Sequence, residues 1–264
     1  MKKGRPFLEI LASAAYEDYR FPILEIFAFL FALGQFAFSN LNVASSLRSE
    51  ELMIYWLVSS AMGLPLFIFL ILIFKNIAYG LGGDLEKGTI QTYLSYPLSR
   101  KKILTAKLLS AIGIAVILFF GIQTVALVVQ VPALILPNIG LILLLYAANF
   151  AYVLLITSII LLFALLIKKG GVALIVGIAV YFAIGIATSI VLLFASLSGS
   201  AMFLQAVALL NPATALSAHY GYIPGNIGWN PSLTEVTYYV GANYFITAIL
   251  FFIAYRYFSR RLSI

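Results

Sequence analysis

The chain has 264 residues, of which 63% are hydrophobic and 9% are charged, and its formal net charge is +7. Soluble globular domains are about 45–50% apolar and about 25% charged, so this composition excludes an ordinary soluble protein. The absence of cysteine excludes disulfides and thiolate metal sites. We therefore expect an all-α polytopic membrane protein, in which lipid solvates the apolar side chains.

Residues 1–20 are predicted to form an amphipathic helix in the membrane interface. They hold several charges and no apolar run long enough for a removable signal peptide. One helical face would carry Phe7, Leu11, Ala14, Ala15 and Tyr19, and the opposite face Glu9, Ser13, Glu17 and Arg20. An ordinary polar N-terminal helix is the alternative that this pattern leaves open.

Six apolar stretches follow, each close to or above the length of about 20 residues that crosses a bilayer as a helix. They are residues 21–39, 52–78, 103–129, 139–167, 172–197 and 239–258. We expect residues 1–264 to form a single membrane domain with six transmembrane helices. Two connections are long enough to have structure of their own, residues 79–102 and residues 198–238.

The basic residues lie almost entirely on one side of these predicted spans. Of the 16 Lys and Arg residues, all but Arg48 fall on the side of the N-terminus. Cytoplasmic loops carry this excess, so both termini are predicted to be cytoplasmic and residues 198–238 external. The positive charge then faces the anionic lipids of the inner leaflet, and no role in binding nucleic acid is needed to explain it.

The cytoplasmic connection has three predicted parts. Glycines at positions 80, 82 and 83 allow the chain to leave the second span and turn. Residues 86–96 are predicted to form a short helix that ends at Pro97, with Ile90, Tyr93 and Leu94 on one face. Ser99 is expected to cap the next helix, whose first turn holds a cluster of three basic residues. That cluster is explained by anionic lipid head groups alone.

This connection also carries a resemblance to a known family. The residues are Glu86-Lys-Gly-Thr89, then Tyr93-Leu-Ser-Tyr-Pro-Leu-Ser-Arg100, and then Lys107-Leu108. They resemble the segment E-x-G-T…L-L-S-x-P-x-S-R…K of type-2 ABC export permeases, the membrane subunits of ATP-driven transporters. The predicted layout of six spans agrees with that family over the whole chain. The sequence departs from the pattern at Tyr93-Leu94, where the family usually has two aliphatic residues.

The resemblance implies that residues 84–99 are a coupling helix that inserts into a groove on a separate ATPase subunit. In or beside that contact would lie Glu86, Gly88, Thr89, Tyr93, Pro97 and Arg100. It also implies short helices within residues 198–238, a second permease copy or a homologous permease as partner, and a multi-pass protein of the plasma membrane. The sequence contains no GxxxxGK[ST] segment, so we expect a transport subunit that is not an enzyme, with Mg-ATP bound by the partner subunit and no cofactor in this chain.

A translocation pathway, if the chain forms one, is predicted to be lined by aromatic and amide side chains within the spans. The candidates are Phe27, Phe31, Gln123, Tyr146 and Asn149. Hydrogen bonding between helices is the alternative role for the amides. Acidic residues are missing from the middle of the spans, and one His and four Met do not favour a metal site. A hydrophobic or amphiphilic substrate therefore fits better than an ion.

Two other functions stay open at this point. A stand-alone secondary carrier or channel would transport without ATP, although the lack of acidic residues in mid-membrane argues against it. A membrane assembly factor or embedded enzyme would need a polar centre, for which Asn211, His219 and Glu235 are the candidates.

Overall fold

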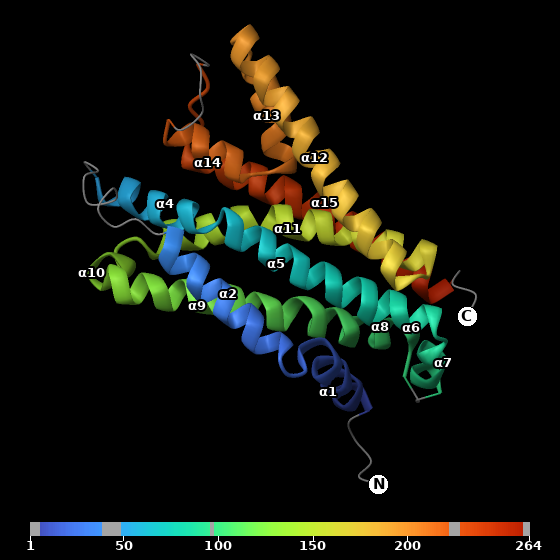
Figure 1. Cartoon of the computed structure of the whole chain (residues 1–264). Coiled ribbons are helices and arrows are strands. Elements are labelled where there is room, and N and C mark those ends of the chain that lie inside the picture. The colour runs from blue at the N-terminus through green and yellow to red at the C-terminus, as the bar shows by residue number, and fades with distance from the viewer. Residues whose placement is uncertain (1–5, 39–48, 96–97, 222–227, 261–264) are drawn as a thin grey trace.

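The computed structural model describes residues 6–38, 49–95, 98–221 and 228–260, and within these ranges it contains helices and no strands (Figure 1). Among these described residues, five helices are long and apolar enough to cross a membrane, or six if one bent pair counts as a single span. The predicted all-α fold with several membrane-crossing helices is confirmed.

The bent pair consists of α1 (Pro6–Tyr19) and α2 (Ile23–Phe38), whose axes differ by 64°. Helix α1 buries Ile10, Ala14 and Asp18, which are spaced four residues apart, together with Tyr19. Of the predicted apolar face, Ala14 and Tyr19 are buried and the other positions are half-buried. Helix α1 packs against two later helices of the same chain, α8 (Arg100–Leu108) and η2 (Leu109–Ile114).

The stretch predicted as a continuous span over residues 52–78 is divided in the structure. It forms α4 (Glu50–Ala61) and α5 (Leu64–Lys75), which are separated at Met62 and Gly63. Pro65 in the first turn of α5 has no backbone N–H, and its ring conflicts with the carbonyl of the residue four positions earlier, so an unbroken helix is unfavourable here.

The second and third spans both contain a segment of π-helix near the connection between them. The order is α5, η1 (Asn76–Gly82), α6 (Gly83–Glu86), α7 (Thr89–Leu94), α8 (Arg100–Leu108), η2 (Leu109–Ile114) and α9 (Ala115–Gln130). The predicted helix over 86–96 begins only at Thr89, because Gly88 has a left-handed φ of 72° that separates α6 from α7. Ser99 stands at the N-cap of α8, but its side chain makes no capping hydrogen bond, contrary to the prediction.

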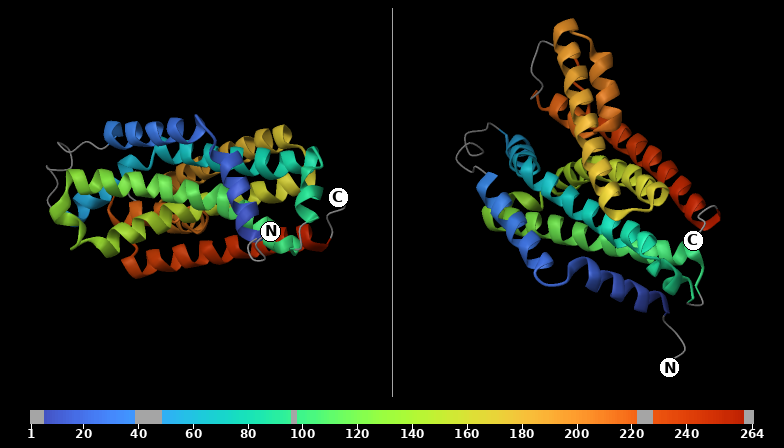
Figure 2. Two further views of the ribbon diagram at one scale, coloured as in Figure 1. Left: turned by 90° about the horizontal axis from the view of Figure 1, so that it is seen from below. Right: turned by 45° about the vertical axis from the view of Figure 1, so that its right-hand side comes forward.

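The remaining helices are α10 (Pro132–Ile135), α11 (Ile139–Ile167), α12 (Gly170–Ser198), α13 (Ala201–Leu210), α14 (Ala213–His219) and α15 (Leu233–Arg260). In its most apolar window α11 is 56% buried, whereas α12 is 6% buried. Helix α11 is therefore central, while α12 and α13 lean away from the other helices (Figure 2). The range 198–238, for which short helices were expected, holds α13 and α14.

Small residues hold the first turns of α12 against the bundle. Gly170, Ala173 and Gly177 are buried, and a Cβ atom added at Gly177 would lie 3.0 Å from the side chain of Ile160. Beyond Gly177 only Ala195 of this helix is buried. The close packing of α12 is thus concentrated at its N-terminal end.

Helix α15 begins earlier than the predicted span at residue 239, because a capping box fixes its start. The Glu235 backbone N–H donates to Ser232 Oγ at 3.2 Å, and the Ser232 backbone N–H donates to Glu235 Oε2 at 2.6 Å. These reciprocal bonds satisfy two of the N–H groups that a helix start leaves without partners.

Candidate functional site

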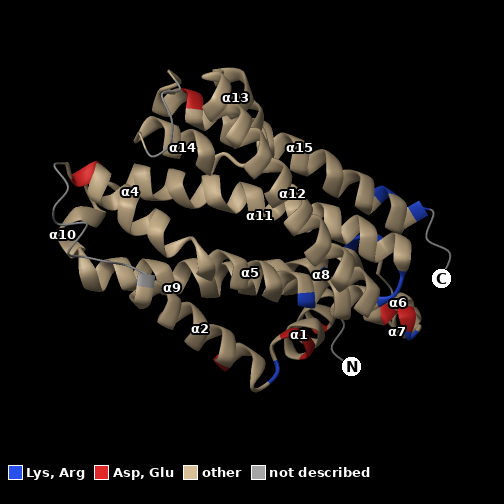
Figure 3. Cartoon of the chain, turned by 45° about the horizontal axis from the view of Figure 1, so that its top comes forward, with Lys and Arg blue, Asp and Glu red and all other residues tan. Residues whose placement is uncertain are grey.

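The ends of the second, third and last spans lie together at one end of the bundle, where most of the described basic residues also gather (Figure 3). Acidic residues of α1 and α6 lie among them. This basic end contains the connection from α6 to α8, for which the coupling role was predicted. It is therefore the candidate site.

The buried Lys107 of α8 is the centre of a group that we call the Lys107 cluster: Glu17, Asp84, Tyr93 and Lys107. The Lys107 Nζ atom lies 2.7 Å from Asp84 Oδ2 and 3.1 Å from Glu17 Oε2. It also lies 4.6 Å from the centre of the Tyr93 ring. The cluster joins α1, α6, α7 and α8 at one point.

Burial explains why Lys107 needs all of these partners. Its side chain is 4% exposed, and an isolated ammonium group at such a position would be strongly unfavourable. Asp84 supplies a carboxylate that is itself mostly buried, and the aromatic face of Tyr93 adds a cation–π contact. Glu17 remains about half exposed, so water screens its interaction with Lys107.

Tyr93 connects α7 directly to α1. Its hydroxyl group donates a hydrogen bond to Glu17 Oε1 at 3.3 Å, and its side chain is buried within this chain. The predicted contact of the Tyr93 ring with a partner groove therefore competes with this internal packing. The outward side of α7 is formed instead by Thr89, Gln91 and Thr92.

Glu86 connects the same segment to α12. Its Oε2 atom accepts a hydrogen bond from the backbone N–H of Gly170 at 2.9 Å. Gly170 is the first residue of α12, where N–H groups lack partners within the helix and a negative charge is favourable. The stretch from α6 to α7 is thus held at one end by α12 and at the other by α1 and α8.

The end of α1 is held by the π-helical segment η2 and by Lys75, the last residue of α5. The Tyr19 hydroxyl lies 3.2 Å from the carbonyl oxygen of Ser110 and 3.0 Å from that of Ala111, and donates to this pair. Ser110 Oγ donates to Asp18 Oδ2 at 2.5 Å, and Lys75 Nζ donates to the Asp18 carbonyl oxygen at 2.7 Å. A π-helical segment departs from the regular α-helical bonding pattern, and such segments are frequent at functional sites.

Tyr19→Phe is expected to lower the free energy of unfolding by about 1–3 kcal/mol, because two buried carbonyl groups lose their side-chain donor. The measurement is chemical or thermal unfolding of the purified chain in detergent. Tyr16→Phe is the matched control, since Tyr16 lies on the same helix with its side chain 76% exposed. Equal stability of the two variants would contradict this role of Tyr19.

The residues predicted for coupling are only partly brought together. Glu86, Gly88, Thr89 and Tyr93 lie along α6 and α7, and Arg100 begins α8. Pro97 lies outside the described residues. The sequence reasoning missed the pairing of Glu17 and Asp84 with Lys107, although one signal was available: Lys107 is the one charged residue in the predicted span 103–129.

The predicted pathway residues lie inside helix packing, with partners of their own. Phe31 is fully buried with its ring centre 5.2 Å from that of Phe119, and Gln123 Nε2 donates to the Val58 carbonyl oxygen at 3.4 Å. Asn149 bonds the preceding turn of its own helix. The remaining aromatic candidates also have neighbours: Phe27 lies beside Phe31, and Tyr146 beside Phe120 and Thr124.

The three candidates for a separate polar centre each bond to backbone groups. Asn211 Oδ1 accepts from the Ala213 N–H, His219 Nδ1 lies 2.8 Å from the Pro231 carbonyl oxygen, and Glu235 completes the capping box. These hydrogen bonds fix the conformation of the chain between α13 and α15.

Comparison with known protein families gives a match over most of the chain. The family model described as "ABC-2 family transporter protein" matches residues 26–261, which include most of α2 and all the later described helices. No individual curated protein matches the chain.

Proposed function

Because the chain belongs to the ABC-2 family of transporter permeases, we propose that it is the membrane subunit of an exporter driven by separate ATPase subunits that bind Mg-ATP. The observation that carries this proposal is the attachment of the segment from α6 to α7 at both ends. Glu86 bonds to the start of α12, and Tyr93 and Asp84 meet Lys107 and Glu17. A force applied to α7 therefore has two direct routes into the bundle.

In this proposal residues 84–99 contact the ATPase through the exposed side of α7. Closure of the ATPase subunits on ATP displaces α7, and the Lys107 cluster and the Glu86 bond convert that displacement into movement of α1, α8 and α12. Such a rigid-body change at an interface is an established kind of switching transition. The basic end of the bundle then faces the cytoplasm, as the positive-inside rule predicts.

A second permease copy or a homologous permease completes the transporter in this proposal. The long, little-buried apolar surface of α12 supports it, because this surface must be covered by lipid or by another membrane protein. The apolar composition of the spans favours a hydrophobic or amphiphilic substrate over an ion.

Thr92→Trp is the substitution that best tests the proposed ATPase contact. Thr92 is exposed on α7, so a large side chain there obstructs a partner without disturbing the Lys107 cluster. We expect it to abolish stimulation of ATPase activity by the permease and to weaken co-purification of the ATPase at least tenfold, a loss of about 1.4 kcal/mol. Glu86→Ala or Tyr93→Ala tests the contact less directly, because both residues also bond within the chain.

Ser13→Trp is the matched control, since Ser13 is exposed on α1 and distant in sequence from α7. Its ATPase co-purification and stimulation should equal those of the unchanged protein. If the unchanged chain captures no ATPase and transports in liposomes on an ion gradient alone, the chain is a secondary carrier and the proposal is wrong.

A further inference from the structure

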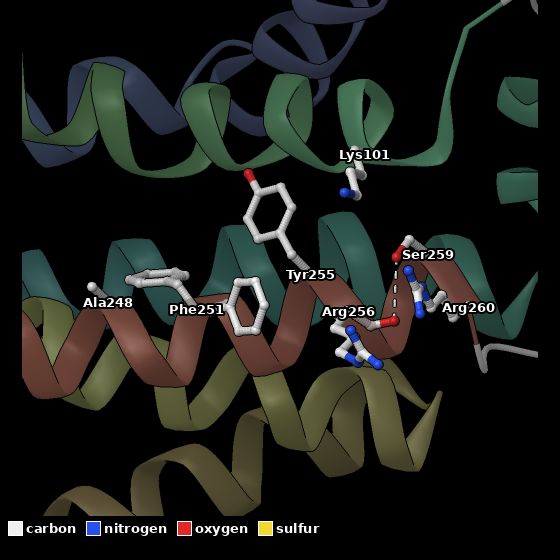
Figure 4. Close-up of a pocket in the computed structure, with 8 residues that line it drawn as sticks. Lys101, Ala248, Phe251, Tyr255, Arg256, Ser259 and Arg260 are labelled. Atoms are coloured by element: carbon white, nitrogen blue, oxygen red, sulfur yellow. Dashed lines mark hydrogen bonds between the residues drawn. The ribbon is translucent and has the colours of Figure 1, made fainter.

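Helices α8 and α15 enclose a groove at the basic end of the bundle. It has a volume of about 540 Å³ and is lined by Lys101, Ala248, Phe251, Phe252, Tyr255, Arg256, Ser259 and Arg260. Figure 4 shows Lys101 reaching from α8 toward α15, which carries the two arginines. The lining contains three cations and no acidic side chain. The mouth of this groove is therefore suited to an anion.

A second groove continues the first one along the third span, away from the basic end of the bundle. It has a volume of about 440 Å³ and shares Phe251 and Tyr255 with the first. Its other lining residues are Thr105, Leu108, Leu109, Ile112, Gly113, Val116, Phe150 and Leu154. Apart from the hydroxyl groups of Thr105 and Tyr255, which lie 3.0 Å apart, this lining is apolar.

The combined groove has the polarity and the length of one lipid molecule in one leaflet. From Lys101 to Val116 the helix axis advances about 20 Å at about 1.5 Å per residue. One leaflet contributes about 15 Å of hydrocarbon, and the head-group layer adds several more. The cations lie at the end that the positive-inside rule places in the inner head-group region, and the apolar residues lie deeper.

The three cations form no ion pair within the described part of the chain, where both salt bridges are made by Lys107. Lys101 also stands in the first turn of α8, where the helix dipole disfavours positive charge. A phosphate group would compensate both effects, because arginine and phosphate form short, charge-assisted hydrogen bonds.

We propose that the groove between α8 and α15 binds an anionic phospholipid of the inner leaflet, with its phosphate at Lys101, Arg256 and Arg260 and one acyl chain along Leu109, Gly113 and Phe150. Basic pockets between transmembrane helices on the cytoplasmic side are known to select such head groups. The bound lipid connects the third span to the last one through groups from both helices.

Native mass spectrometry of the full chain in detergent, titrated with phosphatidylglycerol or with phosphatidylcholine of the same acyl chains, tests the head-group site. We expect phosphatidylglycerol to bind at least about tenfold more tightly, since each basic residue near the surface contributes to anionic lipid binding. The triple variant Lys101→Gln, Arg256→Gln, Arg260→Gln should lose this preference. The control triple Lys87→Gln, Lys102→Gln, Lys169→Gln removes the same charge from exposed positions outside the groove and should keep it.

Gly113→Leu tests the acyl-chain site. A Cβ atom at Gly113 meets nothing within 4 Å, so the larger side chain fills the groove without a clash in the bundle. It should weaken phosphatidylglycerol binding, whereas Gly121→Leu, at a position equally open but outside the groove, should not. Equal binding of the two lipids, equal loss in both triple variants, or equally tight binding of glycerophosphoglycerol without acyl chains would overturn the proposal.

Discussion

Lys107→Met is expected to lower the free energy of unfolding by about 3–5 kcal/mol, because it leaves the buried carboxylate of Asp84 without its cation. Methionine keeps the length and apolar character of the lysine chain, so the packing of α8 is largely preserved. The loss is therefore electrostatic in origin. The measurement is unfolding of the purified chain in detergent, monitored by the circular dichroism signal of its helices.

The double variant Lys107→Met, Asp84→Asn distinguishes this cause from general damage. Removing the second charge should recover a large part of the lost stability, which a double-mutant cycle measures as a coupling energy. Lys102→Met is the control on the same helix, because Lys102 is exposed, and it should change stability by less than about 0.5 kcal/mol. Equal destabilisation by the Lys107 and Lys102 substitutions would refute the proposed role of the cluster.

Gly170→Leu should destabilise the chain by about 2–3 kcal/mol and separate α12 from η1, since overpacking of this kind displaces backbone. A Cβ atom at Gly170 would lie 2.9 Å from the Ala78 carbonyl oxygen and 3.2 Å from the Gly83 nitrogen. Both neighbours are backbone atoms, so no side chain can rotate away. The same displacement breaks the bond between Gly170 and Glu86.

The neighbouring Gly171→Leu is the control, because a Cβ atom there meets nothing within 4 Å. The chain has no cysteine, so cysteines introduced at the exposed Lys87 and Lys169 can carry spin labels without background. The distance between the labels should lengthen or broaden in the Gly170 variant and stay unchanged in the Gly171 variant. An unchanged distance in both would show that α12 is not held where the structure has it.

Some elements were predictable because local sequence determines them. Helix α11 has the bounds predicted for the fourth span, since its apolar run is unbroken and two lysines follow it. The division of α4 from α5 and the early start of α15 also had local signals, Pro65 and the Ser232–Glu235 capping box, which outweigh hydropathy in placing a helix end.

The sequence located the candidate site only as a stretch of the chain and did not predict which residues meet there. The resemblance around Glu86 and Gly88 marked the connection from α6 to α8, but it did not indicate that Tyr93 is buried in the chain itself. The Lys107 cluster joins residues from positions 17, 84, 93 and 107, and such pairing depends on how the helices pack. The π-helical segments η1 and η2, which contact α1, have no local sequence signal comparable to Pro65 or the capping box.

Three of the four buried residues of α12 lie between Gly170 and Gly177, so the rest of this long helix can act as a lever arm. Gly170 lies seven residues before Gly177, and Ser198 lies 21 residues after it, along one continuous helix. If the helix turns rigidly about Gly177, a displacement at Gly170 is enlarged about threefold at Ser198, because the rise per residue is constant. A movement of α7 smaller than the width of an atom would then arrive at the opposite end of the bundle, at the base of α13, as a shift of several ångströms.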